Sequence, residues 1–305
     1  MQVVAATARC SIPADSTGWL VCGIADFAAR LGLGLLLVHV ESPPIVRAAP
    51  HVAFAARNFD AGADRRSTQR ALAQLAARLS DSHPTAAWIA TGDSAESLLR
   101  VAREENAALI ALGSHGTAGT RALHASPAPA ILAGAPSPVL VVPDGVTPTT
   151  RWRLRPIAGA ALRSDADRVN STRGEAVSTS IVCGVDGSPD SRAALHVAQP
   201  VLFTPGLSPG PITAVPAMDE LRAGEQLLDE VIHDEGLETA EPRALHGFPA
   251  ERLADLADEE DAELIVVGSR GRGAFRAAFL GSVSNELIGI ARCPVVVVPP
   301  GAVAE

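Results

Sequence analysis

Glycine and serine residues near the C-terminus have a spacing that suits phosphate binding. The chain reads Gly268-Ser-Arg-Gly271, then nine residues, then Gly281-Ser282-Val283-Ser284. The first glycine pair follows the apolar run 262–267, and the second group opens a segment with helical spacing. Glycines let the backbone approach a ligand closely, and the first amides of a helix point at an anion without an internal acceptor. We therefore predict a phosphate site at the start of that helix, where the hydroxyls of Ser282 and Ser284 can add hydrogen bonds.

Charged residues complete the predicted site from two sides. Arg270, Arg272 and Arg276 bring positive charge close to the expected phosphates. Asp186 ends an earlier apolar run, 180–185, and open α/β sheets bind ligands beyond the carboxyl ends of their strands. We expect the Asp186 carboxylate to face the Gly268 loop and to bind ribose hydroxyls, adenine, or a metal carried by the phosphates. Val215, which ends the next strand, would supply apolar surface against the base.

The chain contains an internal repeat of three sequence blocks in the same order. The blocks are 92–99 with 247–254, 108–116 with 263–271, and 138–143 with 294–299. Such a series indicates a duplicated domain, which agrees with a length of 305 residues. We assign residues 1–146 and 180–305 to the two domains and 147–179 to a linker.

Short apolar runs alternate with segments of helical periodicity in both halves, which is typical of a parallel sheet covered on both faces. The expected strands are 2–7, 34–40, 86–91, 108–112, 138–142, 180–185, 211–215, 262–267 and 294–298. The expected helices are 15–31, 61–80, 94–105, 125–134, 191–198, 219–235, 249–258 and 282–291. Each half is therefore predicted to be a doubly wound, Rossmann-like α/β unit. Its last strand is an apolar edge, so we expect 138–143 and 294–300 to pair with each other.

Residues 147–179 contain arginines at Arg151, Arg153, Arg155, Arg163, Arg168 and Arg173. We interpret the segment as a solvated surface linker. The alternative is a basic strap that crosses a bound phosphate.

The Gly-x2-Gly-x9-Gly-Ser pattern, with Asp186-Gly187-Ser188 closing the first strand, is similar to the ATP-binding motif of the universal stress protein family. The resemblance covers both halves and implies five-stranded parallel domains, dimerisation through the last strand, and ATP binding with little or no hydrolysis. Carried over by position, Val185, Asp186 and Val215 would surround the adenosine, and Ser188 is a further nucleotide-binding candidate. The phosphates and ribose would then be held by Gly268, Arg270, Gly271, Gly281, Ser282, Val283 and Ser284.

The N-terminal half departs from this pattern. Gly113-Ser-His-Gly116 is intact, but Ser126 and Pro127 stand where the third glycine and its serine should be. Pro127 and Pro129 lack amide hydrogens where phosphate donors are needed. The first strand ends near Thr7-Ala-Arg9 without an aspartate. We predict that this half is structural and that His115 is a surface residue.

Composition narrows the class of protein. A net charge of −9 disfavours electrostatic binding to nucleic acid or to an anionic membrane. The N-terminal sequence lacks the features of a secretory signal, so we expect a cytoplasmic protein. Cys10, Cys22, Cys183 and Cys293 lie far apart, which favours reduced, mostly buried thiols over a metal or redox site.

The sequence favours one function over three others. The leading one is an ATP-binding regulator whose occupancy alters conformation or partner affinity, acting alone or as a homodimer. A slow ATP hydrolase is disfavoured because no Walker motif is present and no spacing marks a general base. A nucleotide-free scaffold stays open. An adenylating enzyme of the pyrophosphatase type is disfavoured because the chain lacks a Ser-Gly-Gly-x-Asp-Ser loop.

Overall fold

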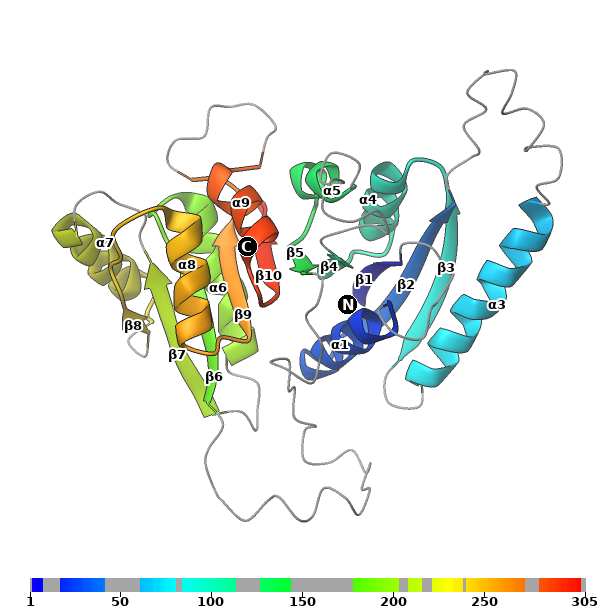
Figure 1. Cartoon of the computed structure of the whole chain (residues 1–305), viewed down its shortest axis with the longest axis horizontal. Helices are drawn as coiled ribbons and strands as arrows, with labels where there is room; N and C mark the ends of the chain where they lie inside the picture. Colours follow the sequence, from blue (N-terminus) through cyan, green and yellow to red (C-terminus); the bar gives the residue numbers. More distant parts are fainter. Residues whose placement is uncertain are drawn as a thin grey trace, which may run out of the picture.

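The strands form one ten-stranded sheet that runs through both halves of the chain (Figure 1). The computed structural model describes residues 2–7, 17–41, 61–80, 84–113, 127–143, 178–202, 208–215, 221–237, 240–271 and 280–302. The order of the strands across the sheet is β3-β2-β1-β4-β5-β10-β9-β6-β7-β8. Each half therefore contributes five consecutive strands, and the two halves meet between β5 and β10.

In the N-terminal half the strands are β1 (Gln2–Thr7), β2 (Gly34–Glu41), β3 (Thr85–Thr91), β4 (Leu109–Gly113) and β5 (Val139–Val142). Its helices are α1 (Thr17–Arg30), α3 (Ala61–Ser80), α4 (Ser94–Glu104) and α5 (Ala128–Gly134).

In the C-terminal half the strands are β6 (Ser178–Gly184), β7 (Ser208–Val215), β8 (Glu241–Pro242), β9 (Leu264–Gly268) and β10 (Val295–Val298). Its helices are α6 (Pro189–Leu202), α7 (Leu221–Asp234), α8 (Pro249–Glu259) and α9 (Ser282–Ile290).

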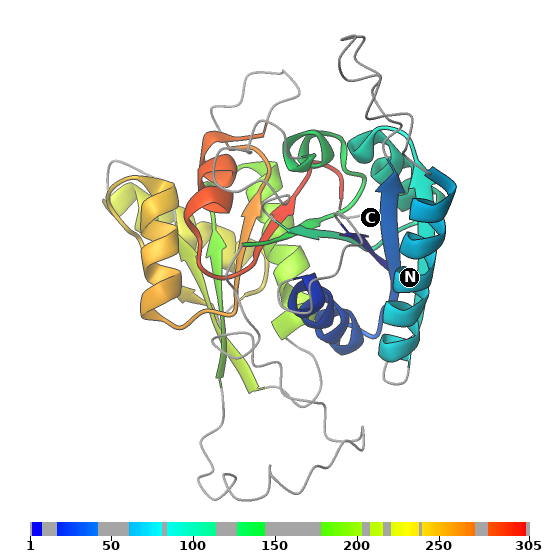
Figure 2. The same ribbon diagram turned by 45° about the vertical axis from the view of Figure 1, so that its right-hand side comes forward.

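All neighbouring strands within a half are parallel, and the junction between the halves is antiparallel. At that junction Val296 lies opposite Leu140, and Val295 lies opposite Val141. The two last strands lie side by side in every view (Figures 1 and 2). The predicted fold class, two Rossmann-like units joined through their last strands, is confirmed.

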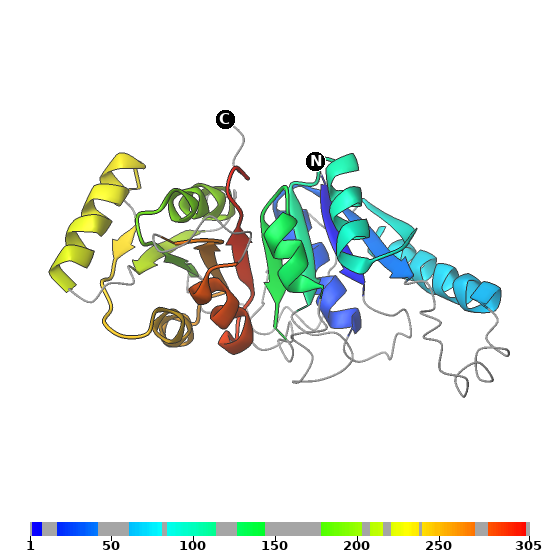
Figure 3. The same ribbon diagram turned by 90° about the horizontal axis from the view of Figure 1, so that it is seen from above.

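Helices cover both faces of the sheet (Figure 3). One buried cluster joins the sheet to α1, α3, α6 and α7, with Ile24, Leu72, Leu195 and Leu228 almost fully buried. The other joins it to α4, α5, α8 and α9. The central strands are apolar on both sides because neither side faces water.

The helix over 61–80 has the predicted bounds, and the other elements begin or end within a few residues of them where the structure describes the chain. A strand was not predicted at β8, which has two residues, one of them Pro242. Strand β6 begins at Ser178, inside the segment expected as linker, and 144–177 lies outside the described residues.

None of the described cysteines forms a disulfide. Cys183 and Cys293 are buried, as expected, whereas Cys22 is exposed. Burial raises the pKa of the Cys183 thiol well above its usual range. Among the described residues, no helix combines the length and the apolar character that a bilayer crossing requires.

Candidate functional site

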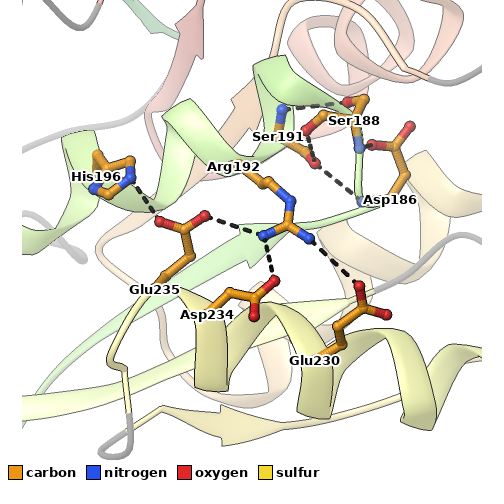
Figure 4. Close-up of polar contacts among 8 residues, drawn as sticks. All are labelled: Asp186, Ser188, Ser191, Arg192, His196, Glu230, Asp234 and Glu235. Atoms are coloured by element: carbon orange, nitrogen blue, oxygen red, sulfur yellow. Dashed lines mark hydrogen bonds and ion pairs between the residues drawn. The ribbon is translucent and has the colours of Figure 1, made fainter. Parts of the chain in front are cut away.

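The loop that follows β6 holds Asp186 in a fixed orientation. Its Oδ1 accepts a hydrogen bond of 2.9 Å from the amide of Ser188 (Figure 4). The Ser188 hydroxyl accepts a bond of 3.3 Å from the amide of Ser191, so Ser188 caps the N-terminus of α6. The Ser191 hydroxyl donates to the Ser188 carbonyl at 2.9 Å. This local network fixes the loop conformation and leaves Asp186 Oδ2 directed elsewhere.

Asp186 Oδ2 lies against the loop that follows β9, as the strand order requires. Strands β6 and β9 are neighbours, with Gly184 opposite Val267. A Cβ atom on Gly271 would lie 2.5 Å from Asp186 Oδ2, which is closer than real contacts allow. Glycine at position 271 is therefore what lets the carboxylate and the loop backbone face each other closely.

The N-terminus of α9 lies beside the same loop. Its N-cap is Gly281, and no side chain caps the helix. The Gly281 amide donates a bond of 2.7 Å to the Ser269 carbonyl. The amides of Ser282, Val283 and Ser284 belong to the first turn and have no acceptor within the helix. These donors and the helix dipole form a suitable environment for an anion.

A cavity of about 180 Å³ adjoins this helix start at the junction of the halves. Ser269, Arg270 and Leu280 line it from the C-terminal half, together with Pro299 and Pro300. Residues 132–135, at the end of α5, line it from the N-terminal half. The cavity is smaller than typical ligand pockets of about 300–1,000 Å³, so it could hold only part of a nucleotide.

Several side chains predicted to contact the ligand are buried or already hydrogen-bonded within the protein. Val185 is 1% exposed and packs in the core, so it can offer a ligand only its main chain. The Ser188 hydroxyl donates to the Arg270 carbonyl at 3.3 Å. The Ser284 hydroxyl donates to the Gly268 carbonyl at 2.8 Å, so its proton is not directed at the helix mouth. The Ser282 side chain is exposed there.

Of the remaining predicted residues, the structure describes some and not others. Val215 ends β7 beside Gly184 in the sheet register. Arg270 is partly exposed in the loop after β9. Arg272 and Arg276 lie outside the described residues, as do Ser126, His115 and the arginine-containing stretch 151–173. Neither the basic strap nor the solvated linker is therefore tested.

An ion-pair network joins α6 to α7 behind the Asp186 loop (Figure 4). Arg192 contacts Asp234 and Glu235, each at 3.2 Å, and reaches Glu230 at 4.0 Å. Burial alone would lower the pKa of Arg192, but the hydrogen bonds and negative charges of Glu235 and Asp234 raise it. His196 Nε2 lies 2.7 Å from Glu235 Oε2. The network fixes the start of α6 relative to the helix that follows β7.

The matching region of the N-terminal half has a different helix start. Pro127 is the N-cap of α5, and Pro129 is the second helical residue. Proline has no amide hydrogen, so this first turn presents fewer donors than that of α9. At the position that matches Asp186, two residues after the first strand, the N-terminal half has Arg9.

Two residues that sequence reasoning did not single out are central to the local geometry. Ser269 Oγ donates to Asp190 Oδ2 at 3.1 Å, and both side chains are buried. A local motif search misses this contact because the two residues are 79 positions apart. The proximity of β6 and β9, which the fold class implies, is the signal that could have suggested it.

Comparison with known proteins identifies the family of this chain. A model of the universal stress protein family matches residues 17–143 and 178–299, which together make up most of the chain. The chain belongs to the universal stress protein family.

Individual universal stress proteins resemble this chain to different extents. One from Thermus aquaticus is 38% identical over 78 residues, which cover 26% of this chain and 57% of that protein. The chain thus spans little more than half the length of that relative. Universal stress protein MT1672 from Mycobacterium tuberculosis is 29% identical over 137 residues, which cover 39% of this chain and 94% of that protein.

A solved structure matches nearly the whole tandem arrangement. The crystal structure of a universal stress protein from Archaeoglobus fulgidus has a TM-score of 0.65 and 17% identity, and the match covers 97% of this chain and 96% of that one. At this identity the similarity establishes the fold alone.

Proposed function

We propose that this chain is an ATP-binding regulator with one nucleotide site, located in its C-terminal half. The proposal rests on one arrangement: the uncapped first turn of α9 and the carboxylate of Asp186 lie on two sides of the Gly268–Gly271 loop. Amides at a helix start bind phosphate, whereas a carboxylate accepts hydrogen bonds from hydroxyl or amino groups. A nucleotide carries both kinds of group at its two ends.

The loop itself fits a ligand that must come close to the backbone. Asp186 Oδ2 already occupies the space that a Cβ on Gly271 would fill, so the loop and the carboxylate together form a narrow cradle. Arg270 adds a cation beside the α9 start. Ser282 and Val283 would contact the phosphates mainly through their amides, and the main chain of Val185 would flank the adenosine together with Val215. Mg²⁺ would enter with the phosphates.

Thermal unfolding with and without ATP tests the proposal. A ligand at 100 times its Kd stabilises the folded state by about 2.7 kcal/mol. For a chain of 305 residues that corresponds to a rise in Tm of about 4 °C. An unchanged Tm at millimolar ATP would contradict the proposal and favour a nucleotide-free scaffold.

Measuring whether bound ATP stays intact distinguishes the regulator hypothesis from the slow-hydrolase hypothesis. The regulator hypothesis predicts that stoichiometric ATP is recovered intact after many hours of incubation with the protein. Conversion to ADP by wild-type protein, abolished in Gly281→Asp, would show instead that the site is a slow hydrolase.

A further inference from the structure

Ser269 uses each of its polar groups to join three elements at the proposed site. Its amide donates to the Val298 carbonyl at the end of β10, at 2.8 Å. Its carbonyl accepts from the Gly281 amide at the start of α9, at 2.7 Å. Its hydroxyl donates to Asp190 in the first turn of α6, at 3.1 Å. The position of the α9 start relative to α6 therefore depends on Ser269.

Asp190 contacts the same turn with both its side chain and its main chain. A Cβ on Gly268 would lie 2.6 Å from the carbonyl carbon of Asp190, so the turn packs directly on the α6 backbone. The Asp190 carboxylate is in the first turn of α6, where the helix dipole favours a negative charge. Its oxygen accepts the Ser269 hydroxyl and thereby fixes the rotation of that side chain.

Asp190 is too deeply buried for direct recognition of a ligand. It is 8% exposed, and Ser269 is 3% exposed. Asp186, four residues earlier, lies against Gly271, whereas Asp190 bonds Ser269 on the α6 side of the loop. Any effect of Asp190 on a bound nucleotide must therefore act through the loop.

We propose that Asp190 and Ser269 are positioning residues that aim the first-turn amides of α9 at the phosphates of the nucleotide. This inference rests on the proposed function. The Asp190–Ser269–Gly281 series of contacts controls the phosphate end of the site, while Asp186 controls the nucleoside end. Loss of the series therefore weakens phosphate binding selectively and makes the site discriminate less between ATP and adenosine.

The test is calorimetric titration of the full chain with ATP, with adenosine affinity measured by competition against bound ATP. Asp190→Ala and Ser269→Ala each lower the ATP affinity about tenfold, which matches the loss of one well-aligned hydrogen bond. The adenosine affinity changes less than about twofold, within the error of additive behaviour. Asp190→Asn still accepts the Ser269 hydroxyl through its amide oxygen and keeps the wild-type ATP affinity. The double alanine variant is no weaker than either single variant, because the two residues act through one contact.

Each other outcome has a distinct meaning. An equal loss of ATP and adenosine affinity overturns the inference, since it shows a general structural role. Unchanged ATP affinity in both alanine variants, or an Asp190→Asn variant as weak as Asp190→Ala, also overturns it. Should Asp190→Ala fail to fold in a circular dichroism control, Ser269→Ala carries the test. A wild-type protein that does not bind ATP overturns the proposed function and this inference together.

Discussion

The starts of α5 and α9 occupy matching positions in the two halves, yet they differ in what they present to solvent. In α9 the N-cap is Gly281 and the next three residues all carry amide hydrogens. In α5 the N-cap is Pro127, and Pro129 removes a second donor. Both helices pack on the same face of the sheet. The comparison teaches that the same place in the fold accommodates helix starts with different numbers of amide donors.

The same contrast extends to the opposite side of each site. After β6, Asp186 is held by the Ser188 amide and lies against Gly271. Two positions after the end of β1 the sequence has Arg9, whereas Asp186 stands two positions after the end of β6. Both halves have the same arrangement of strands and helices, whereas the described polar groups of the proposed site belong to the C-terminal half.

The largest loss of ATP affinity is expected from a substitution at the start of α9. Gly281→Asp places a carboxylate at the N-cap, where a Cβ would already lie 3.1 Å from the Ser269 carbonyl. Repulsion between a like charge and phosphate in such a site costs several kcal/mol, so the ATP affinity should fall at least about 100-fold. Calorimetric titration measures this loss. The matched control, Ser126→Asp in the N-terminal half, should bind ATP like the wild type, and a loss there would assign the site to the wrong half.

A smaller loss is expected from Gly271→Ala. The new Cβ would compete with Asp186 Oδ2 for the same space and turn the carboxylate away from the loop. Losing a hydrogen bond to a charged group lowers affinity by about 10–100-fold. Gly116→Ala, the corresponding change in the N-terminal half, should leave ATP binding unchanged in the same titration. Equal affinities for the two variants would contradict the role of Asp186.

Replacing Arg192 should lower the stability of the C-terminal half without a large change in its ATP affinity. Arg192→Leu removes the ion pairs with Asp234 and Glu235, which are partly exposed and therefore worth about 1 kcal/mol together. The Tm should fall by about 1–2 °C at low salt and by less at high salt, because salt screens exposed charges. Differential scanning calorimetry at two ionic strengths measures both values. An ATP affinity reduced more than about tenfold would show that the network shapes the site itself.

The smallest expected effect comes from restoring a donor to α5. Pro129→Ala returns one amide to the first turn but provides no carboxylate after β1. In a Gly281→Asp background the variant should still fail to bind ATP in equilibrium dialysis. Recovered binding would show that the missing amide alone disables the N-terminal half.

Local sequence patterns were sufficient to predict most of the fold. Helix α3 was predicted with its observed bounds, and Leu72, Leu75 and Leu79 have helical spacing in its second half. The pairing of the last strands followed from two apolar edges. Strand β8 was missed because Glu241–Pro242 is too short and too polar to give a strand pattern. Its pairing with β7 arises from the tertiary structure.

Less of the candidate site could be predicted from the sequence. The glycine spacing and Asp186 stand out in the chain, and their proximity follows from the order of strands β6 and β9. Burial could not be predicted from residue type, so the engagement of Ser284 with Gly268 was not anticipated. The bond between Ser269 and Asp190 joins distant segments and has no local signature.

The number of ATP molecules bound per chain tests the contrast between the halves most directly. Equilibrium dialysis of the full chain against labelled ATP, at saturating concentration, gives this number without a variant. We expect one ATP per chain, bound in the C-terminal half. Two per chain would show that the proline-containing half also binds, and none would show that the α9 start is not a nucleotide site.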